Sequence, residues 1–320
     1  MTARRPAQRG AALLTAMIIV TLIASLAAGM VWQQYRAVQI EAADRARAQS
    51  AWVVQGALDW ARLILKNDNP AQDSFSDFWA TPLAESRLST FLAADASTTT
   101  DDAPDAFLSG SIEDAQGRYN LRALLGGAQV PPAEELTLKL LCSQVNAPPG
   151  TATVVIDGLR AAFSSAASAA SSPASTVAIS TSGPLQPASL DQLSWLGVDA
   201  DTIKRLQPYV TLLPRATPVN LNTAPREVIA ALLNISLADA ERLVQGRKNQ
   251  PLKSTADAAN FLPPNVQIDA GRASVNSSYF IVTGRLRLDE RQLEQRSLVE
   301  RQGKATTVLV RERVSQLIDH

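Results

Sequence analysis

An uncharged stretch near the N-terminus constrains the fold of this chain more than any other feature. Residues 11–32 contain no Asp, Glu, Lys or Arg. A helix over this stretch would reach about 33 Å at 1.5 Å per residue, which is enough to cross a hydrocarbon layer of ~30 Å. Three arginines and no acidic residue precede it, and the positive-inside rule therefore places residues 1–10 in the cytoplasm. We predict a transmembrane helix over residues 11–32, with the rest of the chain beyond the membrane.

The helix is expected to continue past the membrane. A polar stretch rich in Ala, Gln and Arg follows without a break, and the first helix-breaking run is at residues 67–70. A single helix over residues 11–66 is therefore predicted, although a secretory signal cleaved after the small residues 27–29 is an alternative. In its second half, apolar or small residues recur at helical spacing and are expected to face a packed domain: Ala48, Trp52, Val53, Gly56, Leu63 and Ile64.

The composition disfavours an enzyme. The only cysteine, Cys142, excludes an intramolecular disulfide, and no paired Cys or His spacing suits zinc. The single histidine is the last residue, His320, so the commonest general base is missing from any folded interior. Phosphate-binding, nucleophile-elbow and metalloprotease motifs are absent from the sequence. We expect a protein without catalytic activity and keep a tethered periplasmic enzyme as the alternative.

The C-terminal part has the period of β-strands. Apolar residues alternate with Thr283, Arg285 and Arg287, and Ile281 interrupts the alternation. Residues 297–302 and 306–314 are predicted as two further antiparallel strands. Much earlier in the chain, residues 111–121 have the pattern of a strand followed by a glycine turn.

The region between these strands is predicted to be helical. Capping boxes at Ser189–Gln192 and Ser236–Asp239 begin two helices, and Gly197 can end the first. Between them, Pro225 precedes apolar residues at helical spacing, which predicts two helices that pack as a small SAM-like unit. The Ala- and Ser-rich residues 161–184 are predicted as a loop.

The paired helices also resemble helix-hairpin-helix modules that bind DNA. Such modules need a Gly-hydrophobic-Gly turn, which lets a phosphate approach backbone N–H groups at a helix N-terminus. The corresponding triplet here is Asn234-Ile235-Ser236, and acidic residues are interleaved with the nearby bases. We therefore expect no nucleic-acid partner, and DNA binding remains the rival function.

No cofactor is expected, and calcium is the one metal considered. The acidic loop containing Asp101, Asp102 and Asp105 has oxygen ligands, but its spacing matches no EF-hand. A solvated acidic loop explains the same residues, so no metal ligand is assigned.

The first helix begins with a motif that resembles a known processing site. Residues 8–17, Gln-Arg-Gly-Ala-Ala-Leu-Leu-Thr-Ala-Met, are similar to the cleavage region of type IV prepilins and pseudopilins. The resemblance implies that prepilin peptidase cuts between Gly10 and Ala11 and that Ala11 becomes N-methylated. Most members of that superfamily have glutamate at the fifth mature position, where this chain has Thr15.

In lacking this glutamate and in its large size, the chain resembles the K family of minor pseudopilins of type II secretion systems. The string at residues 217–232 and the segment at residues 111–121 are also similar to that family. The resemblance implies an α+β, pilin-like fold: a long N-terminal helix on a small antiparallel sheet, with a large helical insertion. The implied segments are a leader (1–10), the long helix (11–66), the first part of a pilin-like domain (67–122), the inserted domain (123–273) and the C-terminal sheet (274–320).

The same resemblance implies function and partners. The chain is expected in the bacterial inner membrane with its soluble part in the periplasm, at the tip of the pseudopilus. Its implied partners are the I- and J-type minor pseudopilins and prepilin peptidase, with secreted substrate or the secretin as further contacts. The rival within the superfamily is a minor component of a competence or type IV pilus that binds DNA through the insertion.

Overall fold

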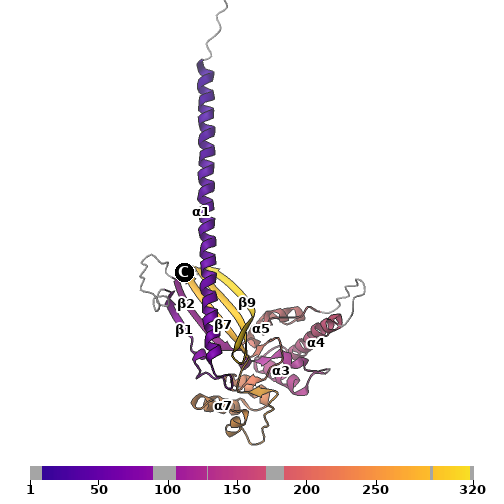
Figure 1. Cartoon of the computed structure of the whole chain (residues 1–320). Coiled ribbons are helices and arrows are strands. Elements are labelled where there is room, and N and C mark those ends of the chain that lie inside the picture. The colour runs from indigo at the N-terminus through magenta and orange to yellow at the C-terminus, as the bar shows by residue number, and fades with distance from the viewer. Residues whose placement is uncertain (1–8, 89–105, 128, 171–183, 289–290, 318–320) are drawn as a thin grey trace, which may run out of the picture. The chain divides into compact units, whose positions relative to one another are not determined.

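The computed structural model describes residues 9–88, 106–127, 129–170, 184–288 and 291–317. By their internal contacts the residues divide into two units, Met1–Gly56 and Ala57–His320. The helix α1, Arg9–Asn67, is continuous through both (Figure 1). In the first unit, α1 is the only element described, whereas the second unit contains a sheet and a set of shorter helices.

The sheet has five antiparallel strands in the order β1-β2-β7-β8-β9. They are listed here with their bounds: β1 (Leu83–Arg87), β2 (Ala106–Asp114), β7 (Tyr279–Leu288), β8 (Arg291–Gln302) and β9 (Ala305–Leu317). Because β2 pairs along its full length with β7, two segments far apart in the sequence lie side by side at the centre of the sheet. The predicted antiparallel sheet is confirmed, and its first and last parts flank a long insertion.

One face of this sheet packs against the last turns of α1. Leu58, Ala61 and Leu65 are at most 5% exposed and contact Phe280 and Val299 of the sheet. Trp79, in a 3₁₀ turn at Phe78–Ala80, completes the cluster by an edge-to-face contact with Phe280, with ring centroids 5.3 Å apart.

The phase predicted for α1 was wrong. Four residues of the expected buried stripe are exposed: Ala48, Trp52, Gly56 and Leu63. The buried side chains of α1 in this cluster are those of Leu58, Ala61 and Leu65 instead, and of the predicted stripe Ile64 packs against them, partly buried. Apolar residues lie on several faces of this helix, so spacing alone does not select the one that meets the sheet.

Ile281 breaks the alternation because both faces of the sheet are covered at this end. It packs with Tyr279, Leu213 and Ala115 on the face opposite α1, against residues of the insertion. In a strand that is buried on both faces, apolar residues need not alternate with polar ones, because polar residues are favoured only on a face that meets water.

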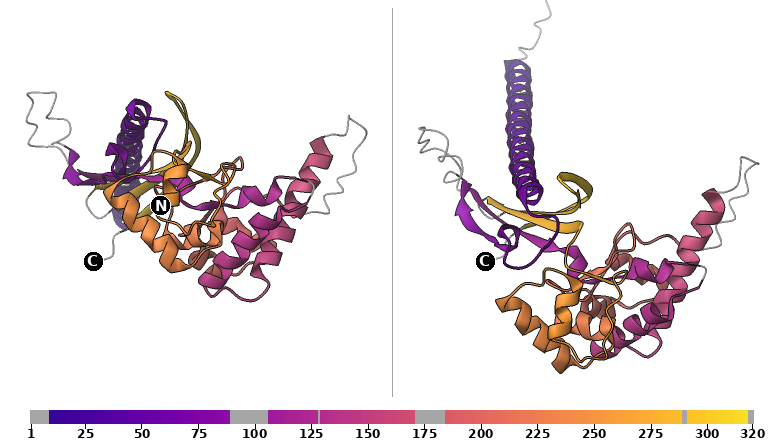
Figure 2. Two further views of the ribbon diagram at one scale, coloured as in Figure 1. Left: turned by 90° about the horizontal axis from the view of Figure 1, so that it is seen from below. Right: turned by 60° about the horizontal axis from the view of Figure 1, so that its bottom comes forward.

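The insertion has its own hydrophobic core and consists mainly of helices (Figure 2). Its helices are α3 (Pro132–Gln144), α4 (Thr151–Ala170), α5 (Ala200–Leu206), α6 (Arg226–Leu233) and α7 (Leu237–Asn249). The 3₁₀ segments are Ala115–Gly117, Leu121–Leu125, Leu190–Leu196 and Thr255–Asn260. Two parallel two-residue pairs tie the insertion to segments at its two ends: β3 (Tyr119–Asn120) with β4 (Val210–Thr211), and β5 (Val219–Asn220) with β6 (Ala273–Ser274).

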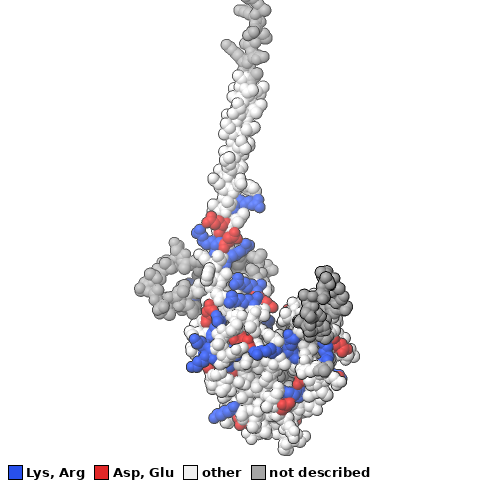
Figure 3. Space-filling model, turned by 45° about the vertical axis from the view of Figure 1, so that its right-hand side comes forward, with Lys and Arg blue, Asp and Glu red and all other residues white. Residues whose placement is uncertain are grey.

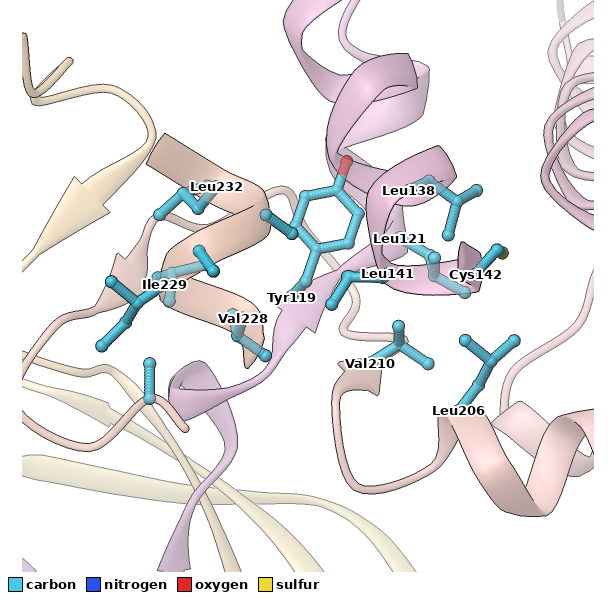
Figure 4. Packing of buried hydrophobic residues seen from close by; sticks show 14 of the residues in the cluster. Tyr119, Leu121, Leu138, Leu141, Cys142, Leu206, Val210, Val228, Ile229 and Leu232 are labelled. Carbon is cyan, nitrogen blue, oxygen red and sulfur yellow. The ribbon is translucent and has the colours of Figure 1, made fainter. Parts of the chain in front are cut away.

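Tyr119 occupies the centre of this core (Figure 4). Its ring lies between Leu232 of α6 and Leu138 of α3, and its hydroxyl donates a 2.8 Å hydrogen bond to the carboxylate of Glu134. Arg272 donates to the other oxygen of Glu134 at 2.6 Å, so the buried charge is paired. Tyr119 thus supplies both apolar contact and a satisfied polar end in the interior.

Local signals in the insertion are largely confirmed. Ser189 and Gln192 form the predicted capping box, although the helix that follows is 3₁₀, and Gly197 ends it with φ +91°. Ser236 caps α7 by accepting a hydrogen bond from the N–H of Asp239. The loop predicted over residues 161–184 was wrong for residues 161–170, which belong to α4, because alanine favours helix wherever nothing breaks it. Residues 171–183 lie outside the described part of the chain. The SAM-like assignment of α6 and α7 remains a prediction.

Candidate functional site

The first candidate site is the apolar part of α1. An 18-residue window of this helix has a mean hydropathy of 2.3 and none of it is buried. Its hydroxyl groups bond within the helix: Thr15 donates to the carbonyl of Ala12 at 3.0 Å, and Ser25 to that of Leu22 at 2.9 Å. Since no hydroxyl there needs water, the segment suits hydrocarbon. It is the white stretch of the helix above the first blue and red side chains in Figure 3.

The polar boundary of this segment is marked by aromatic and charged residues. The guanidinium of Arg36 lies 5.7 Å from the ring centroid of Trp32. Beyond it, exposed ion pairs follow one another along the helix, between Arg45 and Glu41 and between Arg47 and Asp44. A cation beside a tryptophan is typical of the membrane–water interface, where the ring stays apolar and the charge meets water.

The predicted processing residues lie at the beginning of α1. The helix starts at Arg9, so Gly10 and Ala11 are helical, while their side chains and residues 1–8 lie outside the described part. Thr15 follows on the next turn and offers no carboxylate. Cleavage after Gly10, methylation of Ala11 and the assembly role of Thr15 remain predictions.

The second candidate site is a buried polar junction that ties the insertion to the sheet. Asp114, at the end of β2, accepts four hydrogen bonds although it is 8% exposed. The donors are the N–H of Gln116 (2.8 Å), the amide of Asn220 (2.9 Å) and the hydroxyls of Thr223 (2.6 Å) and Ser277 (2.7 Å). They come from the insertion and from the segments on both sides of it, so one carboxylate connects segments more than a hundred residues apart.

An ion pair extends the junction toward the end of α1. Arg301 of β8, itself 3% exposed, donates to both oxygens of Asp73 at 2.5 and 2.7 Å and to Asp68 at 3.1 Å. Its guanidinium lies 4.8 Å from the centroid of the Phe280 ring. The N–H of Ser277 also donates to Asp73, at 2.7 Å, so the ion pair shares a partner with Asp114. Fully hydrogen-bonded pairs of this kind specify one arrangement of the segments that they join.

Burial raises the pKa values of two carboxylates at this junction. Burial raises the pKa of Asp73 to about 7, although the guanidinium of Arg301 acts in the opposite direction. The pKa of Asp114 is also raised by burial, against the lowering effect of its four donors. Both carboxylates are engaged by hydrogen bonds that join distant segments, so their perturbed pKa values accompany a structural role.

The carboxylates of Asp68, Asp73 and Asp77 approach within 4.8 Å of one another, which is close enough for a cation. The positive charge at this point already comes from Arg301, which bonds to Asp68 and Asp73. Asp77 accepts the N–H of Ser74 at 2.6 Å instead. The donor set therefore fits an ion-pair cluster, and the earlier candidates Asp101, Asp102 and Asp105 lie outside the described residues.

The turn between α6 and α7 is poorly suited to phosphate. Asn234 has φ +50° and ends α6, and the hydroxyl of Ser236 donates to the carboxylate of Asp239 at 2.7 Å. A negative charge thus occupies the N-terminus of α7, where a helix-hairpin-helix module would receive a phosphate. Arg247, one of the nearby bases, is buried and donates to the carbonyls of Leu221 and Ala224. These contacts disfavour DNA binding by the insertion.

The predicted residues and the junction overlap very little. Asn220 and Thr223 belong to the conspicuous string at residues 217–232, and Asp114 belongs to the segment at residues 111–121. Sequence analysis placed none of the three in a common site, and it missed Asp73 and Arg301 altogether. No local sequence signal marks these residues, because their burial arises only in the folded chain.

Comparisons with known proteins agree with this architecture. Two family models described as Type II secretion system (T2SS), protein K match residues 117–215 and 219–276. The chain is 25% identical to type II secretion system protein K of Pseudomonas aeruginosa over 310 residues, which cover 90% of this chain and 87% of the relative. It is 27% identical to the protein of the same name in Pectobacterium carotovorum, covering 96% and 97% of the two chains.

A solved structure shares the fold. One chain in the crystal structure of the GspK-GspI-GspJ complex, from the type 2 secretion system of enterotoxigenic Escherichia coli, superimposes with a TM-score of 0.63. The sequence identity is 20%, and the match covers 85% of this chain and 98% of that one. The predicted α+β, pilin-like fold, with a long apolar N-terminal helix, a small antiparallel sheet and further helices, is confirmed.

Proposed function

Because the chain belongs to the family of type II secretion system protein K and is a minor pseudopilin, we propose that it caps the tip of the pseudopilus and initiates its assembly. It is anchored by one apolar helix near its N-terminus. A non-enzymatic role fits a junction whose perturbed carboxylates are all engaged in structural contacts.

The observation that carries this proposal is the absence of a carboxylate in residues 12–40 of the described helix. In the superfamily that this chain resembles, the glutamate at the fifth mature position pairs with the terminal ammonium of a neighbouring subunit. A carboxylate in hydrocarbon is costly unless it is paired, which makes that contact a strong docking determinant. With Thr15 bonded to Ala12, this chain has no such need for a subunit ahead of it.

The inserted domain supports the same position. It contributes the largest hydrophobic cluster among the residues that the structure describes, and it lies at the end of the sheet where Ile281 and Tyr279 contact Leu213. A body of this size repeated along a filament would crowd each neighbour, whereas a single copy at the tip meets no such obstacle.

We infer the partners and the orientation on the same basis. The I- and J-type minor pseudopilins would contact this chain, in line with the composition of the similar GspK-GspI-GspJ complex. Arg4, Arg5 and Arg9 favour a cytoplasmic N-terminus, which places the folded unit in the periplasm and α1 in the inner membrane. Prepilin peptidase would cut between Gly10 and Ala11 on the cytoplasmic side.

Counting subunits tests the tip position. Pseudopili sheared from cells and sorted by length should contain a constant number of copies of this chain per filament, while the major subunit increases with length. A number of copies that grows with filament length would refute the tip assignment. Thr15→Glu provides the matched variant, because a restored carboxylate should admit the chain along the filament and raise its copy number. An unchanged copy number for that variant would show that Thr15 does not determine the position.

The mature N-terminus tests the processing step separately. Mass spectrometry of the membrane-extracted protein should find a chain that begins at methylated Ala11. A chain that retains Met1, or one that begins after Ala28, would contradict processing by prepilin peptidase.

A further inference from the structure

The outer side of β9 is an open sheet edge. β9 is the last strand in the sheet order, so among the described residues no strand pairs with its outer side. Near its beginning, Arg62 of α1 donates to the carbonyl of Thr306 at 2.8 Å and covers that point of the edge. From Leu309 to Val314, every residue of the strand is exposed. The opposite edge differs, since β1 has five residues and its pairing with β2 is irregular.

Long, exposed edge strands are templates for pairing with another chain. The exposed stretch is rich in strand-forming side chains, and Leu309, Val310 and Val314 are 39%, 43% and 50% exposed. A shallow groove of about 120 Å³ lies beside it. Val310 and Glu312 contribute to its lining from β9, together with Leu298, and Ser189, Leu190 and Asp191 form the wall on the side of the insertion.

The groove gives the edge two chemically different faces. Val310 pairs with Leu298 and Glu312 with Arg296, so these side chains lie on the groove side of the sheet. Arg311 pairs with Ser297 and Arg313 with Gln295, which places both arginines on the opposite side. Arg313 donates to the amide oxygen of Gln295 at 2.7 Å. Neither Arg311 nor Glu312 has an ion-pair partner among the described residues.

The charges on β9 favour a different protein over a second copy of this chain as the occupant. In a continuous sheet related by a two-fold axis, only residues on the same face can lie opposite each other. A register centred on residue 312 would oppose Glu312 to itself and Arg311 to Arg313 twice. Registers centred on residue 311 or 313 would oppose an arginine to itself. Like charges directly opposite each other are destabilising. In the remaining registers Glu312 still cannot face an arginine, because it lies on the other side of the sheet from Arg311 and Arg313. Self-pairing therefore never supplies the triplet with opposite charges.

We propose that β9 accepts an extended segment of a different protein, whose acidic, basic and acidic residues lie opposite Arg311, Glu312 and Arg313 and whose flanking apolar residues lie opposite Val310 and Val314. The added strand satisfies the outward backbone groups of β9, and pairing supplies the affinity. Charge complementarity supplies the choice of partner, because opposite charges across a strand pair are favourable where like charges are not. Alternate side chains of the segment enter the groove beside Leu190 and Asp191.

Two peptides with reversed charges provide the test. The probe is a labelled peptide with the sequence Thr-Val-Glu-Lys-Glu-Val-Thr, which has the same pattern in either direction and so fits a parallel or an antiparallel register. The comparison peptide is Thr-Val-Lys-Glu-Lys-Val-Thr. Fluorescence anisotropy with the full-length chain in mild detergent should give a Kd at least ten-fold lower for the first peptide.

A charge-swapped variant makes the test specific to β9. The triple variant R311E/E312K/R313E should reverse the preference and bind the comparison peptide at least ten-fold more tightly. K304E, in the turn before β9, changes the net charge by the same amount and should retain the original preference. If the triple variant prefers the same peptide as the unmodified chain, or if K304E reverses the preference, the assignment is overturned.

Hydrogen exchange on the unmodified chain decides the question even if the triple variant does not fold. Binding of the first peptide should slow amide exchange in residues 309–314 and leave exchange in β1 unchanged. Protection confined to other elements, or equal affinity for the two peptides, would overturn the assignment.

Discussion

Removing the carboxylate of Asp114 should destabilise the folded unit strongly, because it joins donors from the insertion to donors from the segments that flank it. In Asp114→Ala, the N–H of Gln116 and the hydroxyl of Ser277 lose the acceptor that the structure gives them. Asn220 and Thr223 keep other partners, at 3.0–3.1 Å and 3.4 Å. A buried donor left unsatisfied costs about 1–3 kcal/mol, so two such donors cost roughly 2–6 kcal/mol.

Relief of the buried charge offsets part of this cost, since burial raises the pKa of Asp114. We therefore expect the free energy of unfolding to fall by about 3–4 kcal/mol. Asp114→Asn should cost less, about 1–2 kcal/mol, because the amide keeps the shape and one acceptor oxygen. Asp201→Ala, at an exposed acidic residue in the first turn of α5, is the control and should change stability by at most about 0.5 kcal/mol.

The assay is urea unfolding of the full-length chain in mild detergent, followed by circular dichroism and tryptophan fluorescence. Equal slopes of unfolding free energy against urea for all variants would show that their midpoints report stability alone. A loss below about 1 kcal/mol for Asp114→Ala, or one equal to that of Asp201→Ala, would refute the view that this carboxylate holds the insertion to the sheet.

Three further predictions concern other buried groups. Burial raises the pKa of Asp73 from 3.8 to about 7 in the folded chain, so between these pH values the folded state binds more protons than the unfolded state. Relative to Asp73→Asn, the unfolding free energy should therefore fall by up to about 4 kcal/mol from pH 4 to pH 8. A parallel pH dependence of the two proteins would contradict this. Burial raises the pKa of Cys142 to about 11, so iodoacetamide at pH 8 should label the folded chain at least ten-fold more slowly than the urea-unfolded chain. Equal labelling rates would show that the thiol is accessible. In Gly246→Ala, the new methyl group would overlap the ring of Phe261, so a loss of about 1–3 kcal/mol is expected in the same urea assay despite the better helix propensity of alanine. A gain in stability would mean that the ring moves freely aside.

Local features were predictable where local chemistry is sufficient. The period of two in β7, the cap at Ser189 and the left-handed glycine at residue 197 each depend on a few neighbouring residues, and the structure has all three. Ile281 did not fit the period, and the reason lies outside its strand: residues of the insertion, among them Leu213, cover the second face of the sheet.

The candidate junction could not be predicted in the same way. Asp73 and Arg301 are 228 positions apart, and Asp114 meets Ser277 across 163 positions. No periodicity or motif spans such distances, and each residue taken singly has the pattern of an ordinary polar residue in a loop or at the end of a strand. The burial that makes them important exists only once the sheet and the insertion have come together.

The sequence by itself determined the apolar span of α1, because a helix in hydrocarbon must be apolar whatever the rest of the chain does. It also determined the order of helix, strand, insertion and final strands, since these depend on period, caps and breakers. Only the tertiary structure decided which stripe of α1 is buried, which carboxylates hold the insertion to the sheet and which edge of the sheet stays open. Those outcomes depend on which surfaces meet, and a surface acquires its neighbours only when distant segments pack together.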